Sequence, residues 1–344
     1  MKRHLTYLLL LVICPLMGWA QINTERVMAI GRNALYFEDY VLSIQYFNQV
    51  INAKPYLADP YFFRGLAKIN LDDFSGAESD CSEAIERNPF VVNAYQVRGL
   101  ARIQQDKLAD AVKDYQKALE LDPENIALWH NLALCRIRQK EYDAAKNDLD
   151  RLIIISPRYT KAYLMRGEVD LKQKDTLTAE KDFNRAIEID RYDPDTWASR
   201  GMLYLMKEQY KEAEEDLGKA IHLSVRNPGL YINRALARYH QNNLRGAMAD
   251  YDLAIDMDAN NFIGHYNRGL LRAQVGDDNR AIEDFNFVIE MEPDNMMAIF
   301  NRGLLLDQTG DLRGAIKDYT RVLEEYPNFL AGYQYRATAR KKLG

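Results

Sequence analysis

Apolar residues recur three or four positions apart in successive short segments, a spacing that places them on one face of a helix. Within residues 126–159, one face of a first helix is formed by Trp129, Leu132, Ala133 and Arg136. After a polar break at Lys140 and Glu141, a second helical face is formed by Ala145, Leu149 and Leu152. Pro157 ends the segment, because proline lacks the amide hydrogen that a continuing helix needs. The pattern predicts a pair of antiparallel helices.

This segment is one copy of a repeat. Prolines stand at residues 55, 89, 123 and 157, each 34 residues after the last, and again at 293 and 327. Self-similarity at a fixed period is the signature of a repeat architecture. Nine complete repeats fit the chain, and they begin at residues 24, 58, 92, 126, 160, 194, 228, 262 and 296. A partial tenth repeat begins at residue 330, so residues 21–344 are expected to form one array.

Two positions of the repeat hold small side chains. We number positions from 1 to 34 within each repeat. Position 8 is glycine or alanine in all nine repeats, and position 20 is alanine in eight of them, with Ser43 in the first. Because two helices approach closely only where neither carries a bulky side chain, positions 8 and 20 are expected to face each other.

These positions resemble the tetratricopeptide repeat (TPR) family. The family pattern has an aromatic residue at position 4, and the chain supplies Tyr61, Tyr95, Trp129, Tyr163, Trp197 and Tyr231. It has an aromatic residue at position 24, matched by Tyr115, Phe183, Tyr251, Phe285 and Tyr319, and alanine at position 27, matched by Ala84, Ala118, Ala186, Ala220 and Ala254. The closing proline is replaced in three repeats by Arg191, Val225 and Ala259, although Pro194 and Pro228 open the repeats that follow two of them.

The resemblance implies an all-α, right-handed superhelical solenoid whose first helices line a concave groove for a protein or peptide. Positions 2, 5, 9, 12 and 13 would face that groove, which is mostly apolar and aromatic. The candidate groove residues are Phe62, Gln96, His130, Arg138, Leu164, Met202, Met206, Ile232, Tyr239, Tyr266 and Phe300. The leucines common at position 9 have a second interpretation, because they could pack between adjacent first helices. Position 5 has no lysine and position 9 no asparagine, so the carboxylate clamp of some TPR proteins is not expected.

Arginine at position 7 and aspartate at position 23 form a second recurring set. The arginines are Arg64, Arg98, Arg166, Arg200, Arg234, Arg268 and Arg302, and the aspartates are Asp80, Asp114, Asp182, Asp216, Asp250, Asp284 and Asp318. A half-buried guanidinium needs a carboxylate, and its fork favours two parallel bonds. Pairing within a repeat and pairing between repeats account for equal numbers of pairs. We interpret this Arg–Asp ladder as structural and expect it to bind no ligand.

Composition narrows the possible functions. The 344 residues are 47% hydrophobic and 28% charged, with a net charge of -5 and no run of basic residues, which gives no electrostatic basis for binding nucleic acid. The five histidines lack the spacing of a metal site, and neither a phosphate-binding loop nor a nucleophile elbow occurs. The sequence therefore predicts a protein that is not an enzyme and needs no cofactor or metal.

The first residues have the features of a secretory signal peptide. Lys2 and Arg3 precede an apolar run, and small residues come before Gln21, which predicts a signal peptide over residues 1–20. Ile13 occupies the position where a lipoprotein signal needs a small residue, which argues against a lipid anchor at Cys14. The mature chain has no other apolar run that would span a membrane. Cys81 and Cys135 are expected to be buried, unpaired thiols.

The partial tenth repeat carries the pattern of a first helix up to Gly344. Either that helix caps the array, or the natural protein is longer, and its apolar side could support self-association. From these features we predict an interaction scaffold of the bacterial cell envelope, located in the periplasm or attached to the envelope. The alternative is a non-catalytic arm of a larger exported enzyme or sensor whose active domain lies beyond residue 344.

Overall fold

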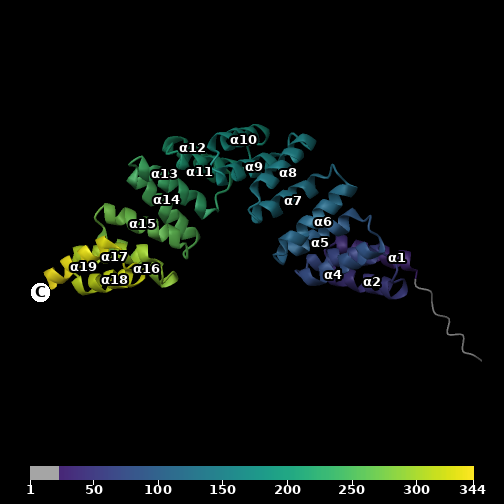
Figure 1. Ribbon diagram of the computed structural model, residues 1–344, viewed down its shortest axis with the longest axis horizontal. Coiled ribbons are helices and arrows are strands. Elements are labelled where there is room, and N and C mark those ends of the chain that lie inside the picture. The colour runs from purple at the N-terminus through teal and green to yellow at the C-terminus, as the bar shows by residue number, and fades with distance from the viewer. Residues whose placement is uncertain (1–22) are drawn as a thin grey trace, which may run out of the picture. The chain divides into compact units, whose positions relative to one another are not determined.

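The computed structural model describes residues 23–344, so the predicted signal peptide at residues 1–20 lies outside the described residues. All regular structure in the described part is helical, and α1 to α19 follow one another along the chain (Figure 1). The helices are α1 Thr24–Tyr36, α2 Tyr40–Ala53, α3 Asp59–Ile69, α4 Phe74–Arg87, α5 Val92–Gln104, α6 Leu108–Leu121, α7 Ile126–Arg138, α8 Tyr142–Ile155, α9 Thr160–Lys172, α10 Thr176–Ile189, α11 Pro194–Met206, α12 Tyr210–Leu223, α13 Pro228–His240, α14 Leu244–Met257, α15 Phe262–Gln274, α16 Asp278–Met291, α17 Met296–Thr309, α18 Leu312–Glu325 and α19 Leu330–Leu343.

Each repeat contributes a first helix and a second helix, as the hydrophobic pattern predicts. The helix ends follow from local chemistry. Asp73 at the start of α4 and Asn243 at the start of α14 each accept a hydrogen bond from a backbone amide of the first turn. Pro194 and Pro228 stand at the first position of α11 and α13, where a missing amide hydrogen costs nothing.

The turn inside each pair places position 15 in the left-handed region of backbone space. The side chains at this position differ, yet φ lies between 58° and 96° in all nine repeats. The residues are Glu38, Asp72, Asp106, Lys140, Lys174, Glu208, Asn242, Gly276 and Gly310. Only the last two are glycine, the residue that adopts this conformation without steric cost. The turn geometry therefore imposes a strained conformation on seven ordinary residues.

The aromatic residue at position 4 forms a hydrogen bond that stabilises the connection between successive repeats. In four repeats its polar atom donates a hydrogen bond to the carbonyl oxygen six residues earlier, over 2.8 to 3.2 Å. The donors are Trp129, Tyr163, Trp197 and Tyr231. A buried aromatic ring with one polar end suits this role, because the ring packs in the core while the donor reaches the backbone of the connection.

Position 8 packs on the second helix of its own repeat: a Cβ atom added to Gly65 would lie 3.3 Å from the backbone oxygen of Ala77 at position 20 and 2.9 Å from Sγ of Cys81 at position 24. A Cβ atom added to Gly99 would lie 2.8 Å from the Tyr115 ring, and one added to Gly167 would lie 2.6 Å from the Phe183 ring. The side chain that meets position 8 is thus the one at position 24, one helical turn beyond the buried alanine at position 20. The reason is size, because the ring at position 24 spans the gap that an alanine methyl leaves open.

The two cysteines of the described chain are buried and unpaired, as expected. Cys81 lies at position 24 opposite Gly65, and Cys135 packs in the cluster around Tyr115 and Leu132. Burial raises the pKa of the Cys135 thiol to about 11, so the thiol stays protonated at neutral pH. Neither cysteine is a reactive group.

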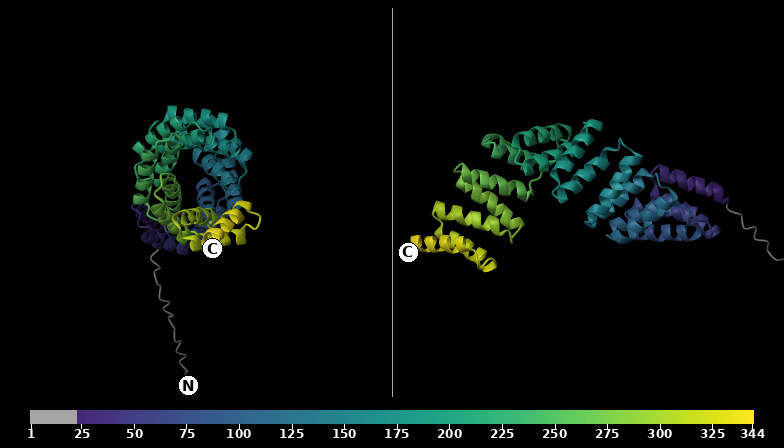
Figure 2. Two further views of the ribbon diagram at one scale, coloured as in Figure 1. Left: turned by 90° about the vertical axis from the view of Figure 1, so that its left-hand side faces the viewer. Right: turned by 45° about the horizontal axis from the view of Figure 1, so that its top comes forward.

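The chain divides into two compact units, Met1–Arg151 and Leu152–Gly344, with the boundary inside α8. Within each unit, consecutive helices pack on one another and the core runs continuously from pair to pair. In the second unit, for example, α15 to α19 lie side by side (Figure 2). One of its core clusters is built around Phe285, Ile299 and Val322, which belong to three successive helices. Each pair therefore completes the core of its neighbour.

Candidate functional site

The arginine at position 7 pairs with the aspartate of its own repeat. Nε and Nη2 of Arg234 donate to the two carboxylate oxygens of Asp250 over 2.9 and 2.7 Å. Arg64 meets Asp80 in the same two-bond arrangement. The other five pairs join residues 16 apart in the same way: Arg98 and Asp114, Arg166 and Asp182, Arg200 and Asp216, Arg268 and Asp284, and Arg302 and Asp318. Of the two pairings that the sequence left open, the structure has the one within the repeat.

Position 11 supplies a second cation to four of these aspartates. Arg238 lies one helical turn beyond Arg234, and its Nη1 donates to Asp250 over 2.8 Å. The equivalent contacts join Lys68 to Asp80, Arg102 to Asp114 and Arg272 to Asp284, over 2.7 to 2.9 Å. The hydrogen bonds that Arg234 donates to Asp250 raise the pKa of Arg234 above its ordinary value. A buried carboxylate is thus held between two cations spaced one turn apart on the first helix, an arrangement that we call the two-cation clamp.

One repeat lacks half of this arrangement. Leu132 occupies position 7, so Asp148 is held by Arg136 alone. Burial raises the pKa of Asp148 to about 6, and the attraction of Arg136 only partly opposes this effect. In the other repeats the arginine at position 7 gives the buried aspartate a two-bond cationic partner that Asp148 lacks.

The predicted groove residues differ widely in exposure. Arg138, Met202 and Met206 are exposed, with 48% and 58% of the two methionines accessible. Ile232 is buried, and the others are half-buried: Phe62, Gln96, His130, Leu164, Tyr239, Tyr266 and Phe300. Several residues at position 9 are more accessible than those at position 5, including Leu134 and Leu270. The apolar surface open to a partner thus lies more at position 9 than at position 5, with Met206 at position 13 adding to it in one repeat.

Tyr266 is engaged by its neighbours. Its ring lies edge-on to Phe285 at 5.8 Å, and Asn301 donates a hydrogen bond to its hydroxyl over 3.1 Å. Burial raises the pKa of Tyr266 above its ordinary value. Tyr266 therefore contributes mainly to packing between α15, α16 and α17, and only part of its surface is available for binding.

Phe300 lines a mainly apolar cavity of about 330 Å³ in the second unit. The cavity is bounded by the start of α17 and the end of α18, and its apolar lining is Met296, Met297, Phe300, Val322, Tyr326 and Phe329. The ring of Phe300 is held edge-on to Phe329 at 5.1 Å and to Tyr335 at 5.7 Å. Met297 is 64% exposed at the rim. A rigid aromatic floor under a flexible methionine suits an apolar side chain of a partner.

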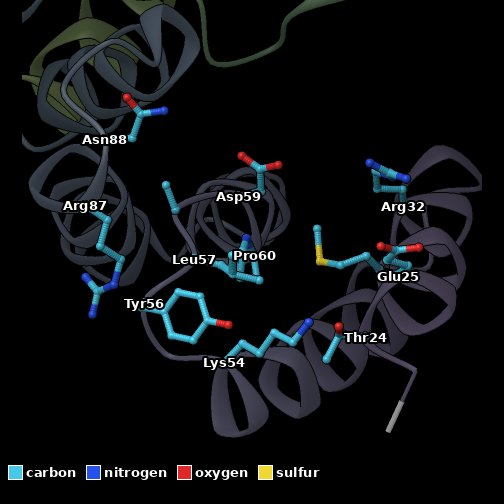
Figure 3. A pocket seen from close by; sticks show the side chains of 12 residues that line it. Thr24, Glu25, Arg32, Lys54, Tyr56, Leu57, Asp59, Pro60, Arg87 and Asn88 are labelled. Carbon is cyan, nitrogen blue, oxygen red and sulfur yellow. The ribbon is translucent and has the colours of Figure 1, made fainter.

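A second cavity occupies the equivalent place in the first repeat, and its lining is charged. It measures about 750 Å³ and lies between α1, the connection from α2 to α3, and the end of α4 (Figure 3). Glu25 and Arg32 come from α1, Lys54 lies opposite them, and Asp59 begins α3. Arg87 is fixed by stacking on Tyr61 and by donating to the Pro55 carbonyl. Sequence reasoning missed this cavity, although Arg32 at position 9, where most repeats have leucine, was a signal for it.

Comparison with protein families gives matches along most of the array. A TPR repeat model matches residues 99–136. A second model, of the tetratricopeptide repeat, matches residues 126–159 and 160–193. A third, also of the tetratricopeptide repeat, matches residues 199–262 and 266–328. No curated protein sequence matches the chain.

Solved structures match at the level of the fold. A chain of the APC/C hetero-tetramer Cut9–Hcn1 is 15% identical with a TM-score of 0.58, and the match covers 84% of this chain and 57% of that one. This chain thus spans little more than half the length of that protein. A tetratricopeptide repeat protein from Parabacteroides merdae is 22% identical with a TM-score of 0.57, covering 72% and 98% of the two chains. PilF of Pseudomonas aeruginosa is 16% identical with a TM-score of 0.57, and the match covers 63% of this chain and 98% of PilF.

Proposed function

Because the chain belongs to the tetratricopeptide repeat family, we propose that it is a protein-interaction scaffold without catalytic activity of its own. Function in a solenoid resides on the surfaces that the stacked helices leave open, since the core between them is filled. The open surfaces of this chain are apolar in places and charged in others, which suits a polypeptide partner better than a nucleic acid.

The apolar cavity beside Phe300 carries the proposal. It places an aromatic floor and the exposed Met297 at positions 5 and 2 of one first helix, which the TPR resemblance assigns to the groove. Met202 and Met206 extend an apolar surface along α11 of the same unit. A partner segment would anchor one apolar side chain in the cavity and contact the methionines with others, in the way that a few buried anchors dominate most interfaces.

Capture experiments with two matched variants test this proposal. Met297→Glu places a charge at the rim of the cavity, whereas Leu253→Glu makes the same kind of change at an exposed position of the second helix α14. Both side chains are exposed, so both variants should fold. We expect Met297→Glu to lose partners that the wild-type chain and Leu253→Glu retain. If the three proteins capture the same partners with equal yield, the cavity is not the binding site.

We further propose that the scaffold works in the bacterial cell envelope, on the basis of the signal peptide expected at residues 1–20. No helix within residues 23–344 has the length and apolar character needed to cross a membrane. Mass spectrometry of the protein isolated from cell fractions should find a periplasmic or envelope-bound form that begins at Gln21. A cytoplasmic form that keeps residues 1–20 would contradict this location.

A further inference from the structure

Gly218 leaves one arginine of the ladder with an unused donor. Six arginines at position 7 direct Nη1 to a side-chain oxygen at position 25 of the repeat before their own, over 2.5 to 3.3 Å. The acceptors are Asn48, Ser82, Asn184, Asp252, Asn286 and Thr320. Position 25 before Arg234 is Gly218, which has no side chain. Within residues 23–344, Nη1 of Arg234 therefore has no acceptor.

The guanidinium of Arg234 is held in place although its Nη1 is unused. Nε and Nη2 donate to Asp250, and the guanidinium lies 5.6 Å from the centre of the Tyr231 ring. The place of the missing side chain is open. A Cβ atom added to Gly218 would have Nη1 of Arg234, 4.0 Å away, as its one near neighbour outside its own helix in the part of the chain that the structure describes. An oxygen atom of another molecule can therefore reach Nη1 without displacing the arginine.

Two pockets meet at Gly218, which lines both of them. One measures about 430 Å³ and is lined by charged and polar residues. Its cations are Lys211 from α12 and Arg234 and Arg238 from α13. Arg238 also donates to Glu214 over 2.8 Å, so this acid of the pocket is already paired. The polar pocket therefore offers a cationic donor to a ligand at the place where Gly218 has no side chain.

The other pocket measures about 380 Å³ and is mainly apolar. Its apolar lining is Tyr192, Trp197 and Leu223, and Tyr192 is 71% exposed. Trp197 is fixed, because its Nε1 donates to the carbonyl oxygen of Arg191 over 2.9 Å and Lys219 lies 4.2 Å from the centre of its ring. A fixed indole beside an exposed tyrosine suits an apolar side chain of a partner.

The charge around the two pockets favours an acidic ligand. Five cations and two acids line them, with His222 counted as neutral: Arg191, Lys211, Lys219, Arg234 and Arg238 against Glu214 and Glu215. Lys219 and Arg234 also contact the buried carboxylates of Asp216 and Asp250, and one positive charge remains in excess when these are included. A hydrogen bond from a guanidinium to a carboxylate is also stronger than one to a neutral oxygen. Both effects favour a carboxylate as the acceptor for Nη1 of Arg234.

We propose that the two pockets form one docking surface, which we call the Gly218 site, for an acidic segment of a partner protein. An aspartate or glutamate of this segment accepts a hydrogen bond from Nη1 of Arg234, and a neighbouring apolar side chain enters the pocket beside Trp197. The carboxylate thus takes the place that a side-chain oxygen fills beside six other arginines of the chain. The Gly218 site is built on α11, α12 and α13 and shares no residue with the cavity beside Phe300, so the two proposals can fail independently.

Two substitutions of Gly218 separate binding from folding. Gly218→Asn supplies the oxygen that Asn48, Asn184 and Asn286 supply in other repeats, so it should fill the place of the partner's carboxylate from within the chain. Gly218→Ala adds a methyl group 4.0 Å from Nη1 of Arg234 and leaves that donor free. Neither variant should have a lower thermal unfolding midpoint than the wild type, because glycine is an unfavourable residue inside a helix.

The probe is a peptide selected from a displayed library of random sequences. The library is first depleted on the Gly218→Asn chain and then selected on the wild-type chain, so that the recovered peptides need the open site. We expect them to contain an aspartate or glutamate near an aromatic or aliphatic residue. In fluorescence anisotropy, a synthetic copy should bind the wild type and Gly218→Ala equally. It should bind Gly218→Asn about tenfold more weakly, as the loss of one hydrogen bond to a charged group implies.

Two further measurements complete the test. Replacing the acidic residue of the peptide by its amide should weaken binding to the wild type, whereas Met297→Glu in the chain should leave binding unchanged. Recovery of no peptide, recovery of peptides without an acidic residue, or equal binding by the wild type and Gly218→Asn would overturn the proposal. Loss of binding by Gly218→Ala would overturn it as well, since the partner would then need bare backbone and not Nη1 of Arg234. Loss of binding by Met297→Glu would place the peptide in the cavity beside Phe300 instead.

Discussion

Both carboxylate oxygens of Asp148 lie 2.7 Å from Nη1 of Arg136, and Arg136 is the one cationic partner of Asp148 within residues 23–344. In other repeats an arginine at position 7, one helical turn before position 11, also bonds the aspartate. Leu132 takes that place here and packs in the apolar core. With one cation in place of two, burial raises the pKa of Asp148 to about 6.

This raised pKa predicts how stability depends on pH. Because the folded pKa of Asp148 is above its unfolded value, the protonated form stabilises the fold, and that contribution is lost as pH rises through about 6. Asp148→Asn should remove this dependence. The free energy of unfolding of the wild type relative to Asp148→Asn should fall by about 2 kcal/mol between pH 4 and pH 7. Urea unfolding followed by circular dichroism measures the difference, and a constant difference across this range would contradict the assignment.

Asp250 differs from Asp148 because it forms ion pairs with two cations, Arg234 and Arg238. Asp250→Asn leaves the half-buried guanidinium of Arg234 without a carboxylate, while Arg238 keeps its bond to Glu214, and should lower the stability by about 3 kcal/mol at neutral pH. Asp256→Asn is the matched control, since Asp256 is exposed on the same helix and its replacement should change little. Thermal unfolding measures both. If Asp250→Asn weakened partner capture while leaving the melting temperature unchanged, the ladder would not be structural.

Because position 15 has a left-handed backbone, introducing glycine there and removing glycine there should change the stability in opposite directions. Glu208 has a φ of 58°, so Glu208→Gly should relieve strain and stabilise the protein by about 0.5 to 1 kcal/mol, after the entropy that glycine adds to the unfolded chain. Gly310 has a φ of 96°, and Gly310→Ala should destabilise it by about 1 kcal/mol. Differential scanning calorimetry of both variants checks the signs. A lower melting temperature for Glu208→Gly would show that the side chain contributes more than the strain costs.

The helix pairs could be predicted because each of their determinants is local. Pro157 ends a helix through its missing amide hydrogen, whatever surrounds it. The 34-residue interval between prolines then assigns every later residue to a position in the repeat. The apolar spacing around Trp129 and Leu149 assigns each helix its buried face. None of these inferences requires knowing which residues meet across the fold.

The candidate site could be predicted only in part, because exposure depends on neighbours. Phe300 and Met202 belong to the same predicted groove, yet Phe300 forms the floor of a cavity among Phe329 and Tyr335 while Met202 projects into solvent. The sequence assigned positions 5 and 9 of the first helix to the same groove, and it did not give the exposure of either. The charged cavity around Arg32 is formed by residues of three helices, α1, α3 and α4, and of the connection from α2 to α3, which no local pattern in the sequence relates.

The sequence by itself determined the repeat, the helix boundaries and the membership of Arg64 and Asp80 in a recurring set, because period, proline and charge are properties of the chain. Tertiary structure decided that Arg64 pairs with Asp80 of its own repeat, that position 15 is left-handed whatever residue stands there, and that Phe300 packs against Phe329 and Tyr335. The physical reason is common to all three. Each depends on how one helix crosses the next, and that geometry is set by packing between residues that no local pattern connects.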